Sequence, residues 1–385
     1  MPTATSPSPV RVATAPAEQP AASQRVVSLD ALRGIDMFFI IGMEEVFGSL
    51  SRMFPMQPTL HERLDHAPWA GFHFYDIIFP LFAFIIGVSL VFSLSKAVAI
   101  EGKSAASLKV IKRGVILFLL GIVLYGGIAN GLEKVRILGV LQRLAICSCF
   151  AGLAFIWLKP RGILALTFTL LAGYWAMMTF IPVPGFGAGD FAEGHNLANW
   201  LDAQYLPFRK WDGDHDPEGL LSSFPAIASS LLGIFAGLLI RDPAVEPRRK
   251  VRNLMLWGAA GIAAGLLWHF QFPIIKKIWT SSFVLFTAGI SAVLLGIFYY
   301  IIDVRNWRGW ARPFVWIGMN AITIYVIVHV VRMDNLARRV VGGEVAAYLD
   351  QLWLGLGSLV PTVMGLLLAI WVCWFLHQRK IFLRV

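Results

Sequence analysis

The stretch LDHAPWAGFHFYDIIFPLFAFIIG, residues 64–87, decides the fold class, because it passes from a polar segment directly into a long apolar run. The run continues to about residue 97, which is long enough for a helix to cross the roughly 30 Å hydrocarbon layer of a bilayer. Its single acidic residue is Asp76, and His66 lies just before the run. We therefore expect a membrane-spanning helix with a titratable pair at its mouth.

The composition of the whole chain also indicates a membrane protein. Of the 385 residues, 57% are hydrophobic and only 15% are charged, and the mean hydropathy is +0.68, a balance that is rare in a soluble domain of this length. Apolar windows of about 20 residues lie near 27–49, 74–97, 108–127, 137–158, 162–182, 219–240, 251–271, 279–302, 313–331 and 356–377. They predict an all-α, polytopic integral membrane bundle of about ten helices.

The placement of the basic residues predicts the topology. Lys and Arg are concentrated in 96–113, 241–252 and 305–312, which lie on the cytoplasmic side if the N-terminus is inside, and this bias places both termini in the cytoplasm. It also accounts for the net charge of +10 without a nucleic-acid partner. Residues 1–25 are rich in Ala, Pro and Ser and predict a disordered cytoplasmic tail rather than a secretory signal. Residues 26–385 then form one transmembrane domain, with the lipid bilayer as its surroundings.

Four polar segments are expected at the outer mouths of the spans. His66 and Asp76 lie at the outer end of the second span, and RILGVLQR (136–143), DHDPEGLLSSFPAI (214–227) and KKIWTSSF (276–283) open three others on the same side. Four polar mouths on one side of the membrane suggest a single pocket.

Several of these residues have a structural reading beside a functional one. His66 is also what an ordinary interfacial histidine would look like, and Asp76 could simply cap its helix. Arg143 lies about two turns inside the fourth span, where a charge usually faces a cavity or a partner, and Gln142 adjoins it. Asn320, a lone amide in the ninth span, could join helices as well as contact a ligand.

A metal site is not predicted. The acidic run DGDHDPEG (212–219) fails as a calcium loop, because Pro217 stands where glycine is needed and Ser223 where a bidentate glutamate is needed. Asp216 and Glu218 in this run either cap a helix or recognise a polar or cationic acceptor. The cysteines lie in apolar spans without the spacing of metal ligands and are Cys147, Cys149 and Cys373.

Six blocks of the sequence carry a family resemblance. They are SLDALRGIDM, HAPWAG with YDIIFPLFAFIIG, RILGVLQRLAI, DPEGLLSSFPAIASSLLG, KKIWTSSFVLFTAG and GMNAITIYV. In this order they resemble the transmembrane acyltransferases that include heparan-α-glucosaminide N-acetyltransferase. The resemblance implies transfer of acetyl from cytoplasmic acetyl-CoA to the amino group of a glucosamine-type sugar across a bacterial inner membrane. It also implies an active-site mouth on the extracytoplasmic side, and a homodimer is plausible by analogy.

The resemblance implies roles for particular residues. The essential histidine of the family falls on His66, and the aspartate before its FP pair falls on Asp76. Where relatives carry an asparagine pair, this chain has Glu44 and Glu45. An acceptor ammonium must lose a proton before it attacks a thioester, a task that suits an imidazole, and Asp76 or Glu44 could orient that imidazole. Direct transfer and an acetyl-histidine intermediate both stay open.

The remaining candidates bind the two substrates. Donors for the thioester oxygen as it becomes an oxyanion are Gln142, Arg143, Ser281 and Ser282. Asn320 is a further candidate on the donor side. The phosphates of acetyl-CoA favour Arg and Lys, and the segment KVIKRG offers Lys109, Lys112 and Arg113, although topology alone could explain these charges. The acceptor candidates are Trp69, Asp216, Glu218 and Glu45.

Two other functions are compatible with the sequence. An amino-sugar permease could use His66, Asp76 and the acidic loop to bind a cationic sugar, with proton coupling through the carboxylates. The opening SLDALRG also resembles membrane enzymes that O-acylate envelope glycans. Dependence on acetyl-CoA separates the enzyme from the permease, and comparison of an amine acceptor with its N-acetylated form separates N- from O-acylation.

Overall fold

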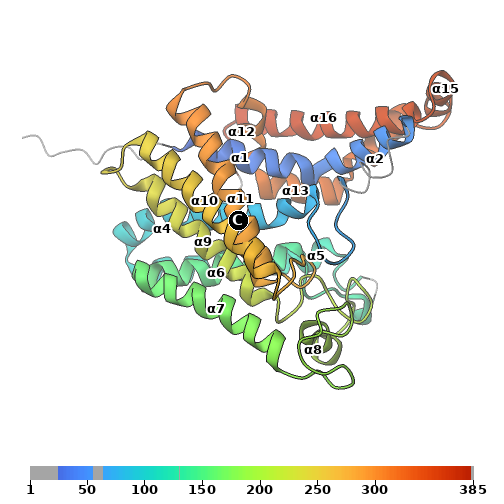
Figure 1. Ribbon diagram of the computed structural model, residues 1–385. Helices are drawn as coiled ribbons and strands as arrows, with labels where there is room; N and C mark the ends of the chain where they lie inside the picture. Colours follow the sequence, from blue (N-terminus) through green and yellow to red (C-terminus); the bar gives the residue numbers. More distant parts are fainter. Residues whose placement is uncertain (1–24, 55–63, 130, 383–385) are drawn as a thin grey trace, which may run out of the picture.

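The protein is a bundle of helices. The computed structural model describes residues 25–54, 64–129 and 131–382, and every regular element within them is helical (Figure 1). The long helices are α4 (Ile78–Glu101), α5 (Lys103–Leu124), α6 (Val140–Trp157), α7 (Pro160–Phe180), α9 (Ser223–Arg241), α10 (Pro247–His269), α11 (Ser281–Phe298) and α16 (Leu356–Gln378). The shorter helices are α1 (Val27–Phe38), α2 (Glu44–Met53), α8 (Leu197–Tyr205), α12 (Arg312–Met319), α13 (Ala321–Val331), α14 (Met333–Val341) and α15 (Glu344–Leu352). The tail predicted over 1–25 lies, except for Arg25, outside the described residues.

The predicted membrane bundle is confirmed, but the count of ten spans is not. In the described part of the chain, 7 helices are long and apolar enough to cross a membrane, or up to 8 if the bent pair α12–α13 is one span. The expected span 27–49 divides into α1 and α2, which are joined by a π-helical turn over Phe39–Met43. The expected span 108–127 falls mostly in α5, whose first half carries several basic residues.

Helices α4 and α9 pack closely at the centre of the bundle. A Cβ at Gly87 of α4 would come within 1.9 Å of the Ser230 carbonyl oxygen, and a Cβ at Gly233 within 2.0 Å of the Phe84 carbonyl oxygen. The Ser230 hydroxyl also donates to the Ala83 carbonyl at 2.7 Å. Small residues that let two backbones approach are a common way to join helices in a membrane, where there is little hydrophobic driving force between helices.

The outer helices present apolar side chains to the surroundings. In the most apolar window of α4, 72% of the residues are buried inside the protein, whereas the figure for α10 is 17% and for α7 is 28%. Phe168 on α7 and Leu267 on α10 are each 71% exposed. Lipid can cover such faces at no cost, which is why an exposed apolar helix is expected in a membrane bundle.

The expected ninth span is broken. Helices α12 and α13 meet at an angle of 79°, and Asn320 between them takes a non-helical conformation with φ −122° and ψ 28°. Just before the break, a Cβ at Gly318 would lie 1.9 Å from the Asp30 carbonyl oxygen of α1. The close packing of α12 on α1 therefore fixes the direction of the first half, and α13 leaves in a new direction.

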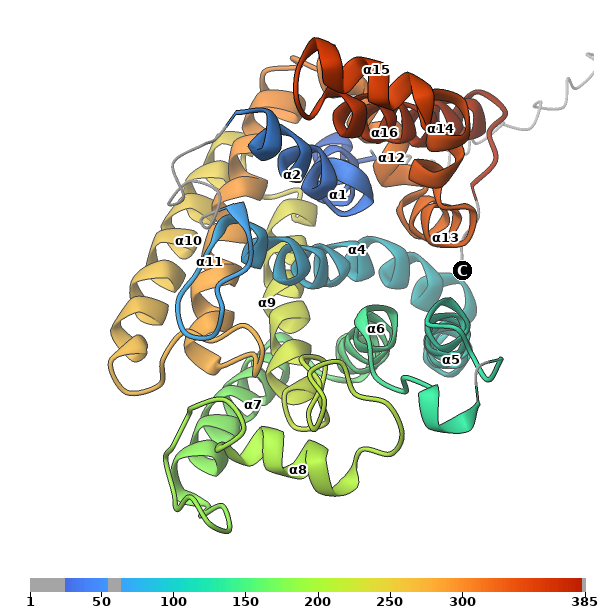
Figure 2. The same ribbon diagram turned by 90° about the vertical axis from the view of Figure 1, so that its right-hand side faces the viewer.

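Three loops gather at one end of the bundle. The loop before α4 lies beside the loop between α10 and α11 (Figure 2), where Ala70 and Ile275 form an isolated antiparallel bridge and the Gly71 N–H donates to the Ile274 carbonyl at 2.9 Å. The third loop runs from α7 to α9 and contains α8. This junction of loops holds the residues described next.

Candidate active site

Asp76 is held at the start of the span by backbone groups. It lies in a short 3-10 turn, Phe74–Ile77, that continues into α4, and its side chain is fully buried. One carboxylate oxygen, Oδ2, accepts the N–H of His73 at 2.8 Å and that of Ala67 at 3.2 Å. The capping role expected for Asp76 is therefore confirmed, and it occupies only one of the two oxygens.

The other oxygen of Asp76 faces His66. The His66 Nδ1 lies 2.9 Å from Asp76 Oδ1, while 44% of the imidazole side chain is exposed. In the tautomer in which Nδ1–H donates to this buried carboxylate, Nε2 carries the lone pair. The ring of Tyr75 meets His66 edge-on at 5.9 Å and so limits its rotation. This is the arrangement of a general base with an orienting acid.

Lys276 completes the cluster, although it is not among the residues predicted from the sequence. Its Nζ lies 2.7 Å from His66 Nδ1, 3.2 Å from His66 Nε2 and 3.3 Å from Asp76 Oδ1. Burial lowers the pKa of Lys276, and the nearby negative charges, led by Asp76, act in the opposite direction. The one sequence signal for this residue is the lysine pair of KKIWTSSF, which the Ala70–Ile275 bridge brings beside His66.

A second polar cluster joins two other segments that precede predicted spans, residues 136–143 and 214–227. Arg136 binds Asp216 through two bonds, from Nε at 2.9 Å and from Nη2 at 2.7 Å, and Nη2 also lies 2.6 Å from Glu218 Oε2. The guanidinium lies over the rings of Tyr125 at 4.7 Å and Trp211 at 4.8 Å. The segments RILGVLQR and DHDPEGLLSSFPAI are thus in contact, as a shared outer site requires.

This cluster places several carboxyl groups close together. Burial raises the pKa of Glu218, against the effect of the positive charges of Arg143 and Arg136. Burial also raises the pKa of Asp202 of α8 to about 6. The Asp202 carboxylate accepts the N–H of Leu220 at 2.8 Å and so holds the loop that precedes α9. Asp216 and Glu218 are paired with Arg136 here, and their role toward an acceptor stays a prediction.

The Arg143 side chain is buried, and only part of its guanidinium is engaged in hydrogen bonds. It is 1% exposed, its guanidinium lies 5.0 Å from the ring of Trp279, and Nη2 donates to the Ser222 hydroxyl. Within the described part of the chain, its Nε and Nη1 have no hydrogen-bond partner, and neither does Oε1 of the adjoining, buried Gln142. Because buried donors are normally satisfied, these free groups are the ones most ready to meet a ligand.

The two serines predicted as oxyanion donors are already engaged. Both lie at the start of α11 and are fully buried. The Ser281 hydroxyl donates to the Leu171 carbonyl at 2.7 Å, and the Ser282 hydroxyl donates to the Pro273 carbonyl at 3.2 Å. Their role toward a ligand stays a prediction that would require these bonds to be exchanged.

Three polar residues predicted on the first and ninth spans lie outside the clusters described above. Glu44 and Glu45 are exposed at the start of α2, and the negative charge of Glu44 still acts on Lys276. Asn320 is 1% exposed, and neither amide atom has a hydrogen-bond partner in residues 25–54, 64–129 and 131–382. Among the described contacts, the partners of His66 are therefore Asp76 and Lys276 rather than Glu44.

The basic residues predicted for the phosphates lie far from His66. Lys109 pairs with Glu101 at 2.5 Å, at the end of α4 opposite to Asp76. A helix of 24 residues is about 36 Å long at 1.5 Å per residue. Lys112 and Arg113 follow on the exposed face of α5. The structure therefore separates Glu101 and its partner Lys109 from Asp76 by about the length of α4, and Lys112 and Arg113 lie about one turn further along α5.

The comparisons with known proteins place this chain among acetyltransferases by sequence. Residues 25–269 match the family described as Heparan-alpha-glucosaminide N-acetyltransferase, catalytic. The chain is 27% identical over 361 residues to the human protein of that name, which covers 78% of this chain and 52% of the human protein. It is 27% identical over 319 residues to the mouse protein, with 68% and 48% covered. The chain thus spans about half the length of these curated relatives.

Proposed function

This chain belongs to the family of the heparan-alpha-glucosaminide N-acetyltransferase catalytic domain, and we propose that it transfers the acetyl group of acetyl-CoA to the amino group of a glucosamine-type sugar. The observation that carries the proposal is the contact of 2.9 Å between His66 Nδ1 and the buried carboxylate of Asp76. The same two residues fall in the family-matched range. Family membership gives no support to the amino-sugar permease.

The chemistry assigned to His66 is removal of a proton from the acceptor. The Nε2 lone pair takes a proton from the sugar ammonium, and the free amine nitrogen then attacks the carbonyl carbon of the thioester. The carbon–sulfur bond breaks, the attacking nitrogen loses its second proton as the amide forms, and that proton goes to the departing CoA thiolate. Asp76 stabilises the imidazolium that forms, and Lys276 is a positioning residue that holds the Asp76 carboxylate through their contact of 3.3 Å.

The oxyanion is assigned to Arg143. As the amine attacks, negative charge develops on the thioester oxygen, and a preorganised donor in a site without water stabilises it strongly. Arg143 offers Nε and Nη1, both buried and without a partner among the described residues, and its guanidinium lies 5.0 Å from the ring of Trp279. Gln142, next to it and fully buried, is assigned to the pantetheine arm.

The distance between the two polar ends supports entry of the donor from the other side. We assign the phosphates of acetyl-CoA to Lys109, Lys112 and Arg113, of which Lys112 and Arg113 lie further along α5, so that the pantetheine arm enters the bundle in the direction of His66. In this proposal about ten segments cross a bacterial inner membrane, both termini are cytoplasmic, and the His66 end faces outward. The acceptor sugar then binds near Trp69 at the same end.

The test is acetyl-CoA-dependent chemistry on a defined acceptor. Purified protein in detergent, given acetyl-CoA and glucosamine, should release CoA thiol and form N-acetylglucosamine. N-acetylglucosamine offered as the acceptor should release none, because only the amine reacts, and CoA release with this sugar would indicate O-acylation instead. Accumulation of labelled glucosamine in proteoliposomes without acetyl-CoA, with no CoA release in detergent, would replace the enzyme with a permease.

A further inference from the structure

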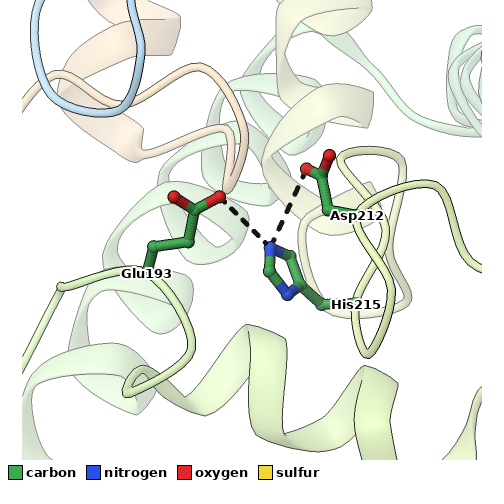
Figure 3. A group of neighbouring side chains, drawn as sticks. All are labelled: Glu193, Asp212 and His215. Atoms are coloured by element: carbon green, nitrogen blue, oxygen red, sulfur yellow. Dashed lines mark ion pairs between the residues drawn. The ribbon is translucent and has the colours of Figure 1, made fainter.

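A group of acidic side chains and one histidine lies beside the proposed active site. Glu193, Asp212 and His215 each direct one ligand atom toward a common point, and these atoms all lie within 4.8 Å of one another. The three side chains come from the loop between α7 and α9 and face each other in Figure 3. Lys277, the neighbour of Lys276, also contacts this group, so the two clusters adjoin.

The environment of the His215 imidazole indicates that the group can accept a cation. Its side chain is 5% exposed, and Nδ1 lies 2.6 Å from Asp214 Oδ1. In the neutral ring, donation of Nδ1–H to this carboxylate leaves the Nε2 lone pair pointing at the group, where Nε2 has no hydrogen-bond partner among the residues that the structure describes. Nε2 lies 3.6 Å from Glu193 Oε1 and 3.8 Å from Asp212 Oδ2. A lone pair that faces two carboxylate oxygens calls for a cation between them.

We propose that Glu193, Asp212 and His215 bind a divalent transition-metal ion of the Zn²⁺ class. Histidine nitrogen and carboxylate oxygen are common ligands of Zn²⁺, and a tetrahedral ion with bonds of about 2.1 Å separates its ligand atoms by roughly 3.4 Å. The observed separations of 3.6 and 3.8 Å are close to this value. Asp214 on Nδ1 supplies the carboxylate that usually orients a ligating histidine.

Lys277 is the competitor of the ion. Its Nζ lies 2.8 Å from Glu193 Oε1 and 3.2 Å from Asp212 Oδ2, so that without metal the ammonium supplies the positive charge. Binding of a divalent ion displaces the ammonium, which also lies 5.8 Å from the ring of Trp69. The ion then ties together the loop that carries Asp216, without taking part in the acetyl transfer assigned to His66.

The sequence rules that exclude a calcium loop do not exclude this site. Asp212 and His215 come from the acidic run, but the third ligand, Glu193, lies outside it, and the alternation of acids along the run plays no part. The inference does not rest on the proposed acetyl transfer, because its readout is bound metal rather than activity.

The experiment measures metal binding to the full chain, purified in detergent without a polyhistidine tag and stripped with a chelator. Titration calorimetry with Zn²⁺ should show one site, and elemental analysis after dialysis should find one equivalent. Asp214→Asn should weaken binding by about 10–100-fold, as loss of an orienting partner does, and His215→Ala should weaken it further. His195→Ala is the matched control, because His195 pairs with Asp190 at 3.0 Å in the same loop but lies outside the group, and it should bind as the parent does.

Lys277→Met distinguishes a metal site from a site made for the lysine alone. Removal of the competing ammonium should leave Zn²⁺ binding at least as tight as in the parent chain, and Zn²⁺ should raise the melting temperature of this variant. If the parent and Lys277→Met both bind no Zn²⁺, or if His215→Ala binds as tightly as the parent, the proposal is wrong. Binding of Mg²⁺ in preference to Zn²⁺ would also contradict the assigned class.

Discussion

Substitution of Asp76 by asparagine divides the two functions of this carboxylate. Oδ2 accepts the N–H groups of Ala67 and His73, whereas Oδ1 faces His66 and Lys276. In Asp76→Asn, the amide oxygen can take the place of Oδ2 and keep both backbone bonds. The amide NH₂ then takes the place of Oδ1 and meets the His66 Nδ1–H and the Lys276 ammonium, which are donors themselves.

The size of the effect follows from these contacts. A hydrogen bond to a charged group contributes about 1.5–3 kcal/mol, but the imidazole is 44% exposed and the lysine side chain is 21% exposed, so water replaces part of what is lost. We therefore expect Asp76→Asn to lower the free energy of unfolding by about 1–3 kcal/mol. The rate should fall by about 10²–10⁴-fold, because His66 loses its tautomer and its orientation. Asp76→Ala also loses the backbone bonds and should cost about 0.5–2 kcal/mol more.

The assay compares CoA release and melting temperature in matched variants. Asp190→Asn is the control, since Asp190 accepts the Ala192 N–H at 2.8 Å and lies 3.0 Å from His195 Nδ1 in an exposed loop. It makes the same chemical change at a carboxylate that also accepts a backbone N–H and faces a histidine, but in an exposed loop, and it should keep full activity. If Asp76→Asn releases CoA at nearly the parent rate while it melts a few degrees lower, the carboxylate is a helix cap only, and the base-plus-orienter reading is refuted.

Three further predictions concern single residues. His66→Ala should reduce CoA release by about 10²–10⁴-fold and leave the thermal shift by acetyl-CoA intact; near-normal turnover would remove the histidine from the mechanism. Arg143→Lys keeps a charge but loses the planar fork, and turnover should fall by about 10²–10³-fold with little change in melting temperature, whereas a stable and fully active lysine variant would exclude the donor role. Because burial raises the pKa of Asp202 to about 6, the folded protein binds more protons than the unfolded chain between about pH 4 and 6, so this carboxyl lowers stability as pH rises through that window. Asp202→Asn does not titrate, and the stability of the parent relative to this variant should fall by up to about 3 kcal/mol from pH 4 to 7, as measured by denaturation at each pH; a constant difference would contradict the shift.

The helices and the titratable pair could be predicted from the sequence for a local reason. The apolar run after Asp76 has the length of a membrane span. A carboxylate at the start of a helix commonly accepts the free N–H groups of the first turn. His66 lies only a short loop away from Asp76, so their contact depends on little more than the chain between them. The assignment of loops to the cytoplasmic or the outer side rests on their charge alone and stays a prediction.

Other features depended on packing between distant segments. The break at Asn320 follows from the close approach of Gly318 to α1, which no window of hydropathy reports. The expected span 27–49 is interrupted by a π-helical turn, although its composition is that of a continuous helix.

The sequence by itself determined that this chain forms a membrane bundle with His66 and Asp76 at one end, because hydropathy and helix capping act over a few residues. Only the tertiary structure decided which cations meet which acids. Lys276 reaches His66 and Asp76, Arg136 reaches Asp216, and Lys277 reaches Glu193. Each of these pairs joins loops far apart in the chain, and the choice among many possible pairs is made by the packing of the helices that carry the loops, since an ion pair adds too little energy to direct the fold.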